Sequence, residues 1–286
     1  ITMEESKMKI AVLSGKGGTG KTLVSVNLAA VASNAAYIDC DVEEPNGYLF
    51  FKPQGIKTLE VTVPVPQIDG LLCNGCRLCV DFCKFNALAF IKDKPVLFPE
   101  ICHSCGGCVI LCPQKAISER PKKVGVVSEG ISGNVRVYGG IMETGESSGV
   151  PILRELFRQS KKEEGLSVID CPPGSSCMVM ESIKDADYCV LVAEPTLFGT
   201  HNLNMVHELV KVFKKPFGVV LNKCVPGENP SEEFCLEHNI TVLGKILFDH
   251  KLGELNSNAY IIADELSEYR ELFVDLLHRI EGEVKA

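Results

Sequence analysis

The sequence predicts an α/β fold, with a mostly parallel sheet that carries helices on both of its faces. Largely apolar stretches at 35–41, 166–174 and 187–196 have the composition of strands buried on both sides, and helical segments alternate with them. A strand, a glycine-rich loop and a helix open this pattern near residue 8. Two runs of closely spaced cysteines within 64–121 interrupt it. We therefore expect one α/β domain that is divided by a smaller inserted domain.

The expected elements can be placed in chain order. The first part of the α/β domain, 8–63, should contain two strands and the helix between them. A proline-rich boundary opens the inserted domain, 64–121, and the second part of the α/β domain follows at 122–286. Its periodicity predicts strands at 134–142, 166–174, 187–196, 216–223 and 241–249, and helices at 150–164, 200–213, 230–239 and 266–284.

The composition argues against several classes of protein. A net charge of −8 disfavours binding to nucleic acid or to anionic membrane surfaces, so neither is expected as a partner. The polar, acidic start lacks the features of a signal peptide, and no apolar run reaches the ~18 residues of a membrane span. The closing helix is more acidic than basic, unlike a membrane-surface helix. We expect a cytoplasmic protein.

A phosphate-binding loop is predicted between the first strand and the first helix. The sequence GKGGTGKT matches the pattern G-x-x-x-x-G-K-[ST] in the strand–loop–helix setting that this pattern requires. Backbone N–H groups of the loop and the N-terminus of the helix would bind phosphate oxygens. Lys21 should reach the β and γ phosphates, and the Thr22 hydroxyl should bind Mg²⁺. The residues expected to bind the nucleotide here are Gly15, Gly17, Gly18, Thr19, Gly20, Lys21 and Thr22.

Lys16 adds a second lysine to this loop. The sequence KGGTGKT resembles the deviant Walker A motif of the MinD/ParA/Mrp superfamily of P-loop ATPases, which includes the nitrogenase iron protein. The resemblance implies ATP and ADP as ligands, Mg²⁺ as the metal, and an ATP-dependent homodimer. In that family the first lysine reaches the nucleotide of the partner subunit, so Lys16 is expected to act in trans.

Acidic residues after two strands extend the resemblance. DCDVEEPN is similar to the family's D-x-D element, which implies that Asp41 positions or activates the attacking water. VIDCPPG is similar to its Walker B and switch II segment, so Asp170 is expected to hold Mg²⁺ and Gly174 to sense the γ-phosphate. Asn222 matches the position that contacts adenine, and an ordinary cap or turn residue is the alternative at each place. The expected catalytic residues are Lys16, Lys21, Asp41 and Asp170.

Eight of the fourteen cysteines form two C-x2-C-x2-C-x3-C runs, which have metal-ligand spacing. From Cys73 to Cys102 the first run recurs at a shift of 29 positions. Tandem runs of this kind resemble two-cluster bacterial ferredoxins, in which the fourth cysteine of each run binds the other [4Fe–4S] cluster. The resemblance implies an α+β, bacterial-ferredoxin-like fold for the inserted domain. Two structural zinc sites are the alternative. The resemblance implies one cluster on Cys73, Cys76, Cys79 and Cys112, and a second on Cys102, Cys105, Cys108 and Cys83.

The other cysteines carry weaker signals. Cys40, Cys189 and Cys224 lie in or beside apolar strands and are expected to be small buried side chains, while Cys235 should be inert. Cys177 follows the segment similar to switch II, and the nitrogenase iron protein has a subunit-bridging cluster cysteine at a similar offset. A bridging role for Cys177 is therefore an open alternative.

The leading hypothesis is a MinD-like ATPase that couples ATP binding, hydrolysis and dimerisation to electron transfer through two [4Fe–4S] clusters. An iron–sulfur scaffold or carrier of the Mrp type is the first alternative, although the cysteines outside the two runs form no C-x-x-C pair. A redox-sensing positioning or regulatory ATPase is the second. The expected partner beyond the homodimer is an unidentified redox protein or cluster acceptor.

Overall fold

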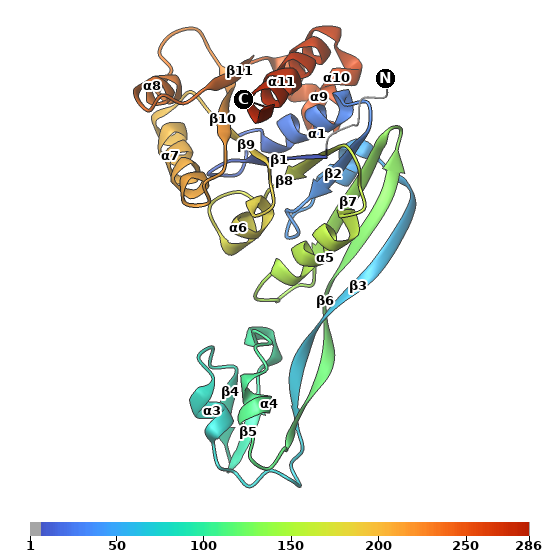
Figure 1. The fold of residues 1–286 in the computed structure, drawn as a ribbon, viewed down its shortest axis with the longest axis vertical. Coiled ribbons are helices and arrows are strands. Elements are labelled where there is room, and N and C mark those ends of the chain that lie inside the picture. The colour runs from blue at the N-terminus through green and yellow to red at the C-terminus, as the bar shows by residue number, and fades with distance from the viewer. Residues whose placement is uncertain (1–6, 286) are drawn as a thin grey trace.

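The computed structural model describes residues 7–285, and a nine-stranded sheet forms its centre (Figure 1). Most strands are parallel to their neighbours, as the sequence predicts, but the edge strand β3 (Gln54–Ile68) and its neighbour β6 (Ile117–Ser132) are long and antiparallel. The parallel strands are β1 (Met8–Leu13), β2 (Ala35–Asp39), β7 (Val135–Met142), β8 (Leu166–Asp170), β9 (Tyr188–Ala193), β10 (Phe217–Cys224) and β11 (Val242–Leu247). The order across the sheet is β11-β10-β9-β1-β8-β2-β7-β6-β3.

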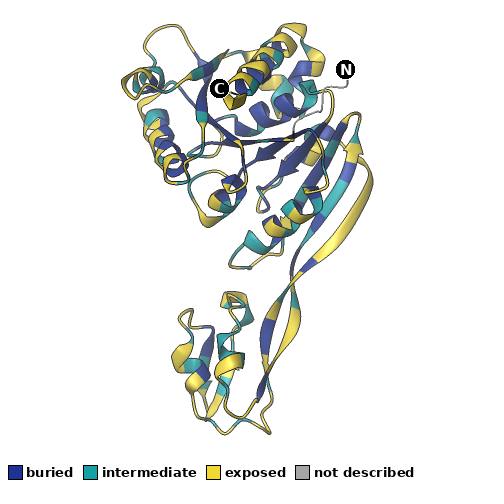
Figure 2. Cartoon of the chain, in the orientation of Figure 1, coloured by how far each residue is buried: buried dark blue, intermediate teal, exposed yellow. Residues whose placement is uncertain are grey.

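Helices cover both faces of this sheet. Successive residues of β1 show the reason, because Ile10 and Val12 pack in one apolar layer while Ala11 and Leu13 pack in the other. Figure 2 shows the sheet buried between the two layers, which explains why its strands are apolar throughout. The first layer contains α1 (Lys21–Val31), α2 (Gly47–Phe51), α9 (His250–Ser257), α10 (Ile262–Glu265) and α11 (Ser267–Lys285), and the second contains α5 (Val150–Ser160), α6 (Cys177–Ile183), α7 (Leu197–Val212) and α8 (Pro230–Glu237).

The strand order gathers functional segments at one edge of the sheet. β1 lies between β8 and β9, and β2 lies beside β8. The carboxyl ends of parallel strands meet at the same edge, and ligands of open α/β sheets bind there. The glycine loop after β1, the acidic residues after β2 and the segment after β8 are therefore neighbours.

β3 and β6 continue beyond the sheet as a two-stranded arm, and the cysteine-rich segment is attached at its far end (Figure 1). Pro64 and Pro66, which were expected to mark a domain boundary, lie inside β3 and are paired with β6. An edge strand accommodates proline because one of its sides needs no N–H donors. The boundaries expected at 63/64 and 121/122 therefore fall within the arm.

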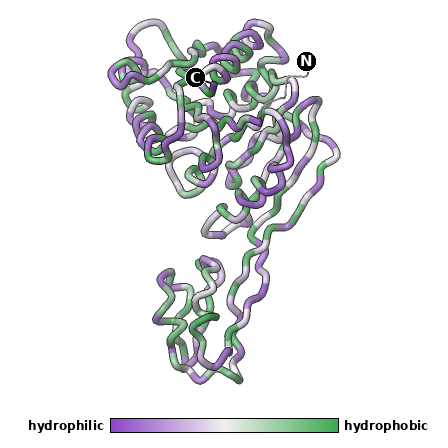
Figure 3. The backbone as a smooth tube through the Cα atoms, in the orientation of Figure 1, coloured by the Kyte–Doolittle hydropathy of each residue, from purple (hydrophilic) through white to green (hydrophobic). Residues whose placement is uncertain are grey.

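The segment carried by the arm forms a small unit. Its internal repeat is structural as well, because α3 begins at residue 78 and α4 at residue 107, the same 29-position shift as the cysteines (107 − 78 = 29). Cys79, Leu88 and Ile117 form a small buried core, and Figure 3 shows further hydrophobic stretches in the unit. Its elements are α3 (Leu78–Phe82), β4 (Leu88–Ile91), β5 (Lys94–Leu97), the 3-10 helix η1 (Pro99–Ile101) and α4 (Gly107–Leu111).

The helix predicted at 150–164 ends at Ser160, and the one predicted at 200–213 begins at Leu197, where Thr196 caps its N-terminus. The short helices α2, α6, α9 and α10 were not expected. Each has eight residues or fewer, so it holds too little of the helical period to be recognised in the sequence.

Candidate nucleotide site and cysteine pockets

The glycine loop lies between β1 and α1, and its glycines are needed where the backbone meets its neighbours. Gly20 has a φ of +98°, and a Cβ there would lie 2.0 Å from the amide nitrogen of Asn222. A Cβ at Gly15 would lie 2.2 Å from the carbonyl oxygen of Asn202. The loop therefore rests tightly on two neighbouring segments, while around Gly17 and Gly18 a Cβ would meet no atom within 4 Å. That open part is where a ligand's phosphates have room to bind.

Lys21 and Asp170 form a buried ion pair at the base of this loop. The Lys21 Nζ lies 2.6 Å from Asp170 Oδ1, and the Tyr37 hydroxyl donates to Asp170 Oδ2 at 2.8 Å. Burial acts to lower the pKa of Lys21, but the Asp170 carboxylate outweighs it and raises the pKa. The lysine is therefore charged, and it already lies at the end of α1 to which phosphates are drawn.

Asp39 and Asp41 lie beside this pair. The Asp39 carboxylate accepts hydrogen bonds from the backbone N–H groups of Asp41, Asn46 and Gly47 at 2.8 to 3.1 Å, so it shapes the turn that carries Asp41. Asp39 is opposite Asp170 in the parallel register. Burial and the Asp170 charge raise the pKa of Asp39 to about 7. Burial also raises the pKa of Asp41, whose side chain is only partly covered.

Two lysines at the rim of the loop share one carboxylate, which the sequence did not point to. Lys16 Nζ lies 2.6 Å from Glu194 Oε2, and Lys223 Nζ lies 2.7 Å from Glu194 Oε1. Lys223 also donates to the carbonyl oxygen of Gly18 at 2.7 Å. Burial acts to raise the pKa of Glu194, but the two ammonium groups outweigh it and lower the pKa. Glu194 directly follows β9, the neighbour of β1, and this position could have suggested it.

The remaining predicted nucleotide-site residues also lie around the loop. The Asn222 side-chain amide donates to the carbonyl oxygen of Thr19 at 2.8 Å, and its own oxygen accepts from the Lys223 N–H at 2.9 Å. Asn222 is thus buried beneath the loop and supports it. Gly174 has a φ of +89°, and its N–H donates to the carbonyl oxygen of Ser14 at 2.9 Å. This bond joins the segment after β8 directly to the residue that precedes the loop.

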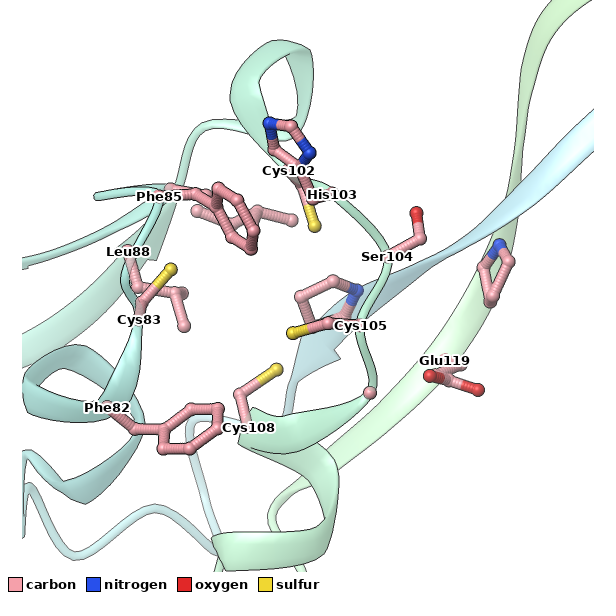
Figure 4. Close-up of a pocket in the computed structure, with 15 residues that line it drawn as sticks. Phe82, Cys83, Phe85, Leu88, Cys102, His103, Ser104, Cys105, Cys108 and Glu119 are labelled. Atoms are coloured by element: carbon pink, nitrogen blue, oxygen red, sulfur yellow. The ribbon is translucent and has the colours of Figure 1, made fainter. Parts of the chain in front are cut away.

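The eight cysteines of the two runs line two separate pockets in the small unit. The first pocket, named after the first run, is lined by Cys73, Cys76, Cys79 and Cys112. The second pocket is lined by the first three cysteines of the second run and by Cys83 of the first (Figure 4). In Figure 4 the four sulfur atoms of the second pocket point into the space between them, and Phe82, Phe85 and Leu88 lie around it. Each pocket thus takes three cysteines from one run and the fourth from the other.

Burial affects the thiols that lie deepest. It raises the pKa of Cys108 to about 11 and also raises the pKa of Cys79. These thiols are therefore protonated at neutral pH in the structure described, and binding of iron would release their protons. Between residues 7 and 285, no three His, Cys, Asp or Glu side chains converge closely enough to hold a single metal ion. Each pocket is instead surrounded by four cysteine thiols, and four cysteine ligands suit either a [4Fe–4S] cluster or a structural zinc ion.

The cysteines outside the two runs divide into two kinds. Cys40, Cys189 and Cys224 are buried, as expected for small core side chains, and Cys171 and Cys235 are buried as well. Cys177 is exposed at the start of α6. An exposed thiol satisfies one condition for a bridge between subunits, and the role of Cys177 stays an open prediction.

A strand–glycine loop–helix unit with a buried lysine and a strand-end aspartate defines a P-loop nucleotide-binding protein. The chain belongs to the CobQ/CobB/MinD/ParA nucleotide binding domain family, whose sequence profile matches residues 10–259. The arm and the small unit lie within this span. No helix within residues 7–285 has the length and apolar character needed to cross a membrane.

Known relatives span nearly the whole chain. An uncharacterized protein of Methanocaldococcus jannaschii is 31% identical over 278 residues, which is 96% of each chain. The iron-sulfur cluster carrier protein of the same organism is 24% identical, and the match covers 98% of this chain and 87% of the carrier. The septum site-determining protein MinD of Pyrococcus horikoshii, solved with Mg-ADP, has a TM-score of 0.60 at 18% identity and covers 96% of both chains. That likeness shows the shared MinD-type fold.

Proposed function

We propose that this protein is an Mg²⁺-dependent ATPase that couples ATP binding, hydrolysis and dimerisation to electron transfer through two [4Fe–4S] clusters. The observation that carries the proposal is the division of the cysteines into two sets of four thiols, each lining its own pocket. In this proposal residues 64–121 act as an inserted ferredoxin-like domain, and residues 8–63 and 122–286 act as one ATPase domain.

The residues around the glycine loop support ATP hydrolysis. Lys21 would turn from Asp170 to the β and γ phosphates, since ATP supplies a stronger anionic partner in the same place. Asp170, freed from Lys21, would then hold Mg²⁺ with the Thr22 hydroxyl. Asp41 would orient the attacking water, and Asp39 would hold the turn on which Asp41 lies. Phosphoryl transfer needs mainly such positioning and charge neutralisation.

The cysteine pockets fit the proposed clusters in donor type and number. Four thiolates are the usual ligand set of a [4Fe–4S] cluster, and each pocket offers four. When bound, each cluster would supply reversible one-electron transfer between a low-potential donor and an acceptor protein. Phe82 and Phe85 line the second pocket with apolar surface, and the fourth cysteine of each run, by binding the other run's cluster, would tie the two halves of the unit together.

In the proposed homodimer, Lys16 binds the nucleotide of the partner subunit. In the structure described, Lys16 pairs with Glu194 of its own chain and lies 5.2 Å from the centre of the Phe198 ring. To reach a partner subunit's nucleotide, Lys16 would have to leave both contacts. Glu194 would therefore oppose dimerisation until ATP on the partner offers Lys16 a better site.

Replacing Glu194 with glutamine tests this competition. Glu194→Gln removes the charge that holds Lys16, so we expect half-maximal dimer formation at a two- to fivefold lower ATP concentration, on the order of a partly exposed ion pair. Sedimentation across an ATP series measures the midpoint. Glu208→Gln is a matched control, because Glu208 pairs with a lysine of α7 away from the loop. A midpoint that is unchanged or raised in Glu194→Gln would contradict the competition.

A carrier of iron–sulfur clusters is the second candidate function. It is favoured by the similarity to the iron-sulfur cluster carrier protein of Methanocaldococcus jannaschii. A carrier must release its cluster, so at least one cluster should transfer to an apo-acceptor protein faster with ATP. An electron-transfer protein should instead keep both clusters through repeated cycles of reduction and oxidation. Anaerobic protein with bound iron can be cycled with dithionite and a mild oxidant in the presence of MgATP and apo-ferredoxin. Retention of iron through ten cycles supports electron transfer, and ATP-stimulated loss of iron to the acceptor supports the carrier.

A further inference from the structure

We propose that Lys122 is the positioning residue that holds the second cysteine pocket against the ATPase domain and transmits the nucleotide state to it. The role of Lys122 in transmitting the nucleotide state rests on the proposed function above, whereas its role in positioning the pocket does not. Lys122 lies on β6, in the arm, at the place where three separate segments of the chain approach one another.

Lys122 makes two kinds of contact at once. Its Nζ donates to the carbonyl oxygen of Pro99 at 3.0 Å, and it lies 2.8 Å and 3.1 Å from the two carboxylate oxygens of Glu146. The side chains of Lys122 and Glu146 are only 16% and 12% exposed. A charge pair so well covered is held firmly, because separating it would leave a buried charge without a partner. Lys122 thus joins the small unit to the ATPase domain.

On one side the contact leads directly to the second pocket. Pro99 begins η1, and its carbonyl oxygen also accepts the backbone N–H of Cys102 at 3.4 Å. Cys102 is the first cysteine of the second run and lines the pocket shown in Figure 4. A shift of Lys122 would therefore move the carbonyl group that anchors this cysteine.

On the other side the contact leads to the nucleotide site. Glu146 lies in the loop between β7 and α5, whose two ends touch the segment after β2. The N–H of Met142 donates to the carbonyl oxygen of Val42 at 2.9 Å, and a Cβ on Gly149 would lie 2.5 Å from Val42 and 2.7 Å from the sulfur of Met178. Val42 follows Asp41, the residue proposed to orient water.

Met178 connects the same loop to the segment that follows β8. It lies on α6, just after the residues that contain Gly174. Both segments expected to respond to the γ-phosphate therefore pack against the loop that carries Glu146. Contiguous packed contacts of this kind can carry coupling between sites. No comparable contact to the second pocket is made by Lys123, which pairs with Glu143 at 2.9 Å and is 40% exposed.

The experiment uses three full-length variants: Lys122→Met, the double variant Lys122→Met with Glu146→Gln, and Lys123→Met as the matched control. The double variant removes both charges, so a loss of folding caused by the unpaired Glu146 is separated from the loss of the contact. Amide hydrogen exchange without nucleotide measures positioning. We expect exchange at residues 100–106 to accelerate about tenfold in both Lys122 variants and to stay unchanged in Lys123→Met. Unchanged exchange in the double variant would overturn the positioning role.

The second readout isolates the cluster of the second pocket by adding Cys112→Ser to every protein. EPR-monitored titration then measures how far MgATP changes the reduction equilibrium of that cluster. We expect a change of about tenfold with Lys122 present and less than about twofold in the double variant, with Lys123→Met like the parent. A full MgATP response in the double variant would overturn transmission through Lys122. No response in the parent protein would instead contradict the proposed function, and the exchange result would still decide the positioning role.

Discussion

Cys112→Ser is expected to remove the cluster of the first pocket and to lower the iron content from about eight to about four atoms per chain. The reason is that Cys112 belongs to the second run by sequence but lines the pocket of Cys73, Cys76 and Cys79. The iron content of anaerobically purified protein measures the loss. Cys235→Ala is the control, since Cys235 is buried on α8, lines neither cysteine pocket and should leave the iron unchanged.

Two double variants decide whether the fourth cysteines cross. Cys112→Ser with Cys76→Ser should leave about four iron atoms, because both residues line the same pocket. Cys112→Ser with Cys105→Ser should leave almost none, because each pocket then loses a ligand. The opposite pattern, with iron retained only in the second double variant, would contradict the crossed arrangement.

Lys21→Met is expected to lower ATP hydrolysis by about 10²- to 10³-fold, the usual effect of removing one preorganised charge from a transition state. Lys21 lies at the start of α1 beneath the open part of the glycine loop, and it is only 7% exposed. Phosphate release at saturating MgATP measures the rate. Lys251→Met, on the exposed side of α9, should hydrolyse ATP like the parent.

Folding of the Lys21 variant needs a separate check, because Asp170 would keep only Tyr37 as a partner. Breaking a buried ion pair in this way costs about 3–5 kcal/mol of stability. The double variant Lys21→Met with Asp170→Asn removes both charges, so its free energy of unfolding should be closer to that of the parent. It should hydrolyse ATP no faster than Lys21→Met. Normal hydrolysis by a folded Lys21→Met protein would contradict the role of this lysine.

Most residues of the candidate nucleotide site could be predicted from local sequence patterns. The glycine loop and the strand-end aspartate are short patterns whose chemistry is set by neighbours in sequence, so Lys21 and Asp170 could be found without a structure. The shared carboxylate of Glu194 could not, because Lys16, Lys223 and Glu194 come from three distant segments. Their contact depends on β9 lying beside both β1 and β10, and strand order is not encoded in any one segment.

The arm was missed for a different reason. Pro64 and Pro66 normally interrupt strands, so the sequence suggested a boundary where the structure has an edge strand that tolerates them. The grouping of Cys83 with the second run was expected from the resemblance to two-cluster ferredoxins; Cys83 lines the second pocket, and its role as a cluster ligand stays a prediction. The contact between Lys122 and Glu146 depends on how the arm meets the ATPase domain, which local periodicity does not describe.

If ATP and the clusters act on each other, as proposed, binding of ATP should change the reduction potentials of the wild-type protein. EPR-monitored titration of the anaerobic protein should give two reversible one-electron centres near roughly −400 mV. With MgATP, at least one of them should shift by about 60 mV or more, a tenfold change in the reduction equilibrium of a one-electron couple. Centres that resist reduction, or two potentials that MgATP leaves unchanged, would contradict the account.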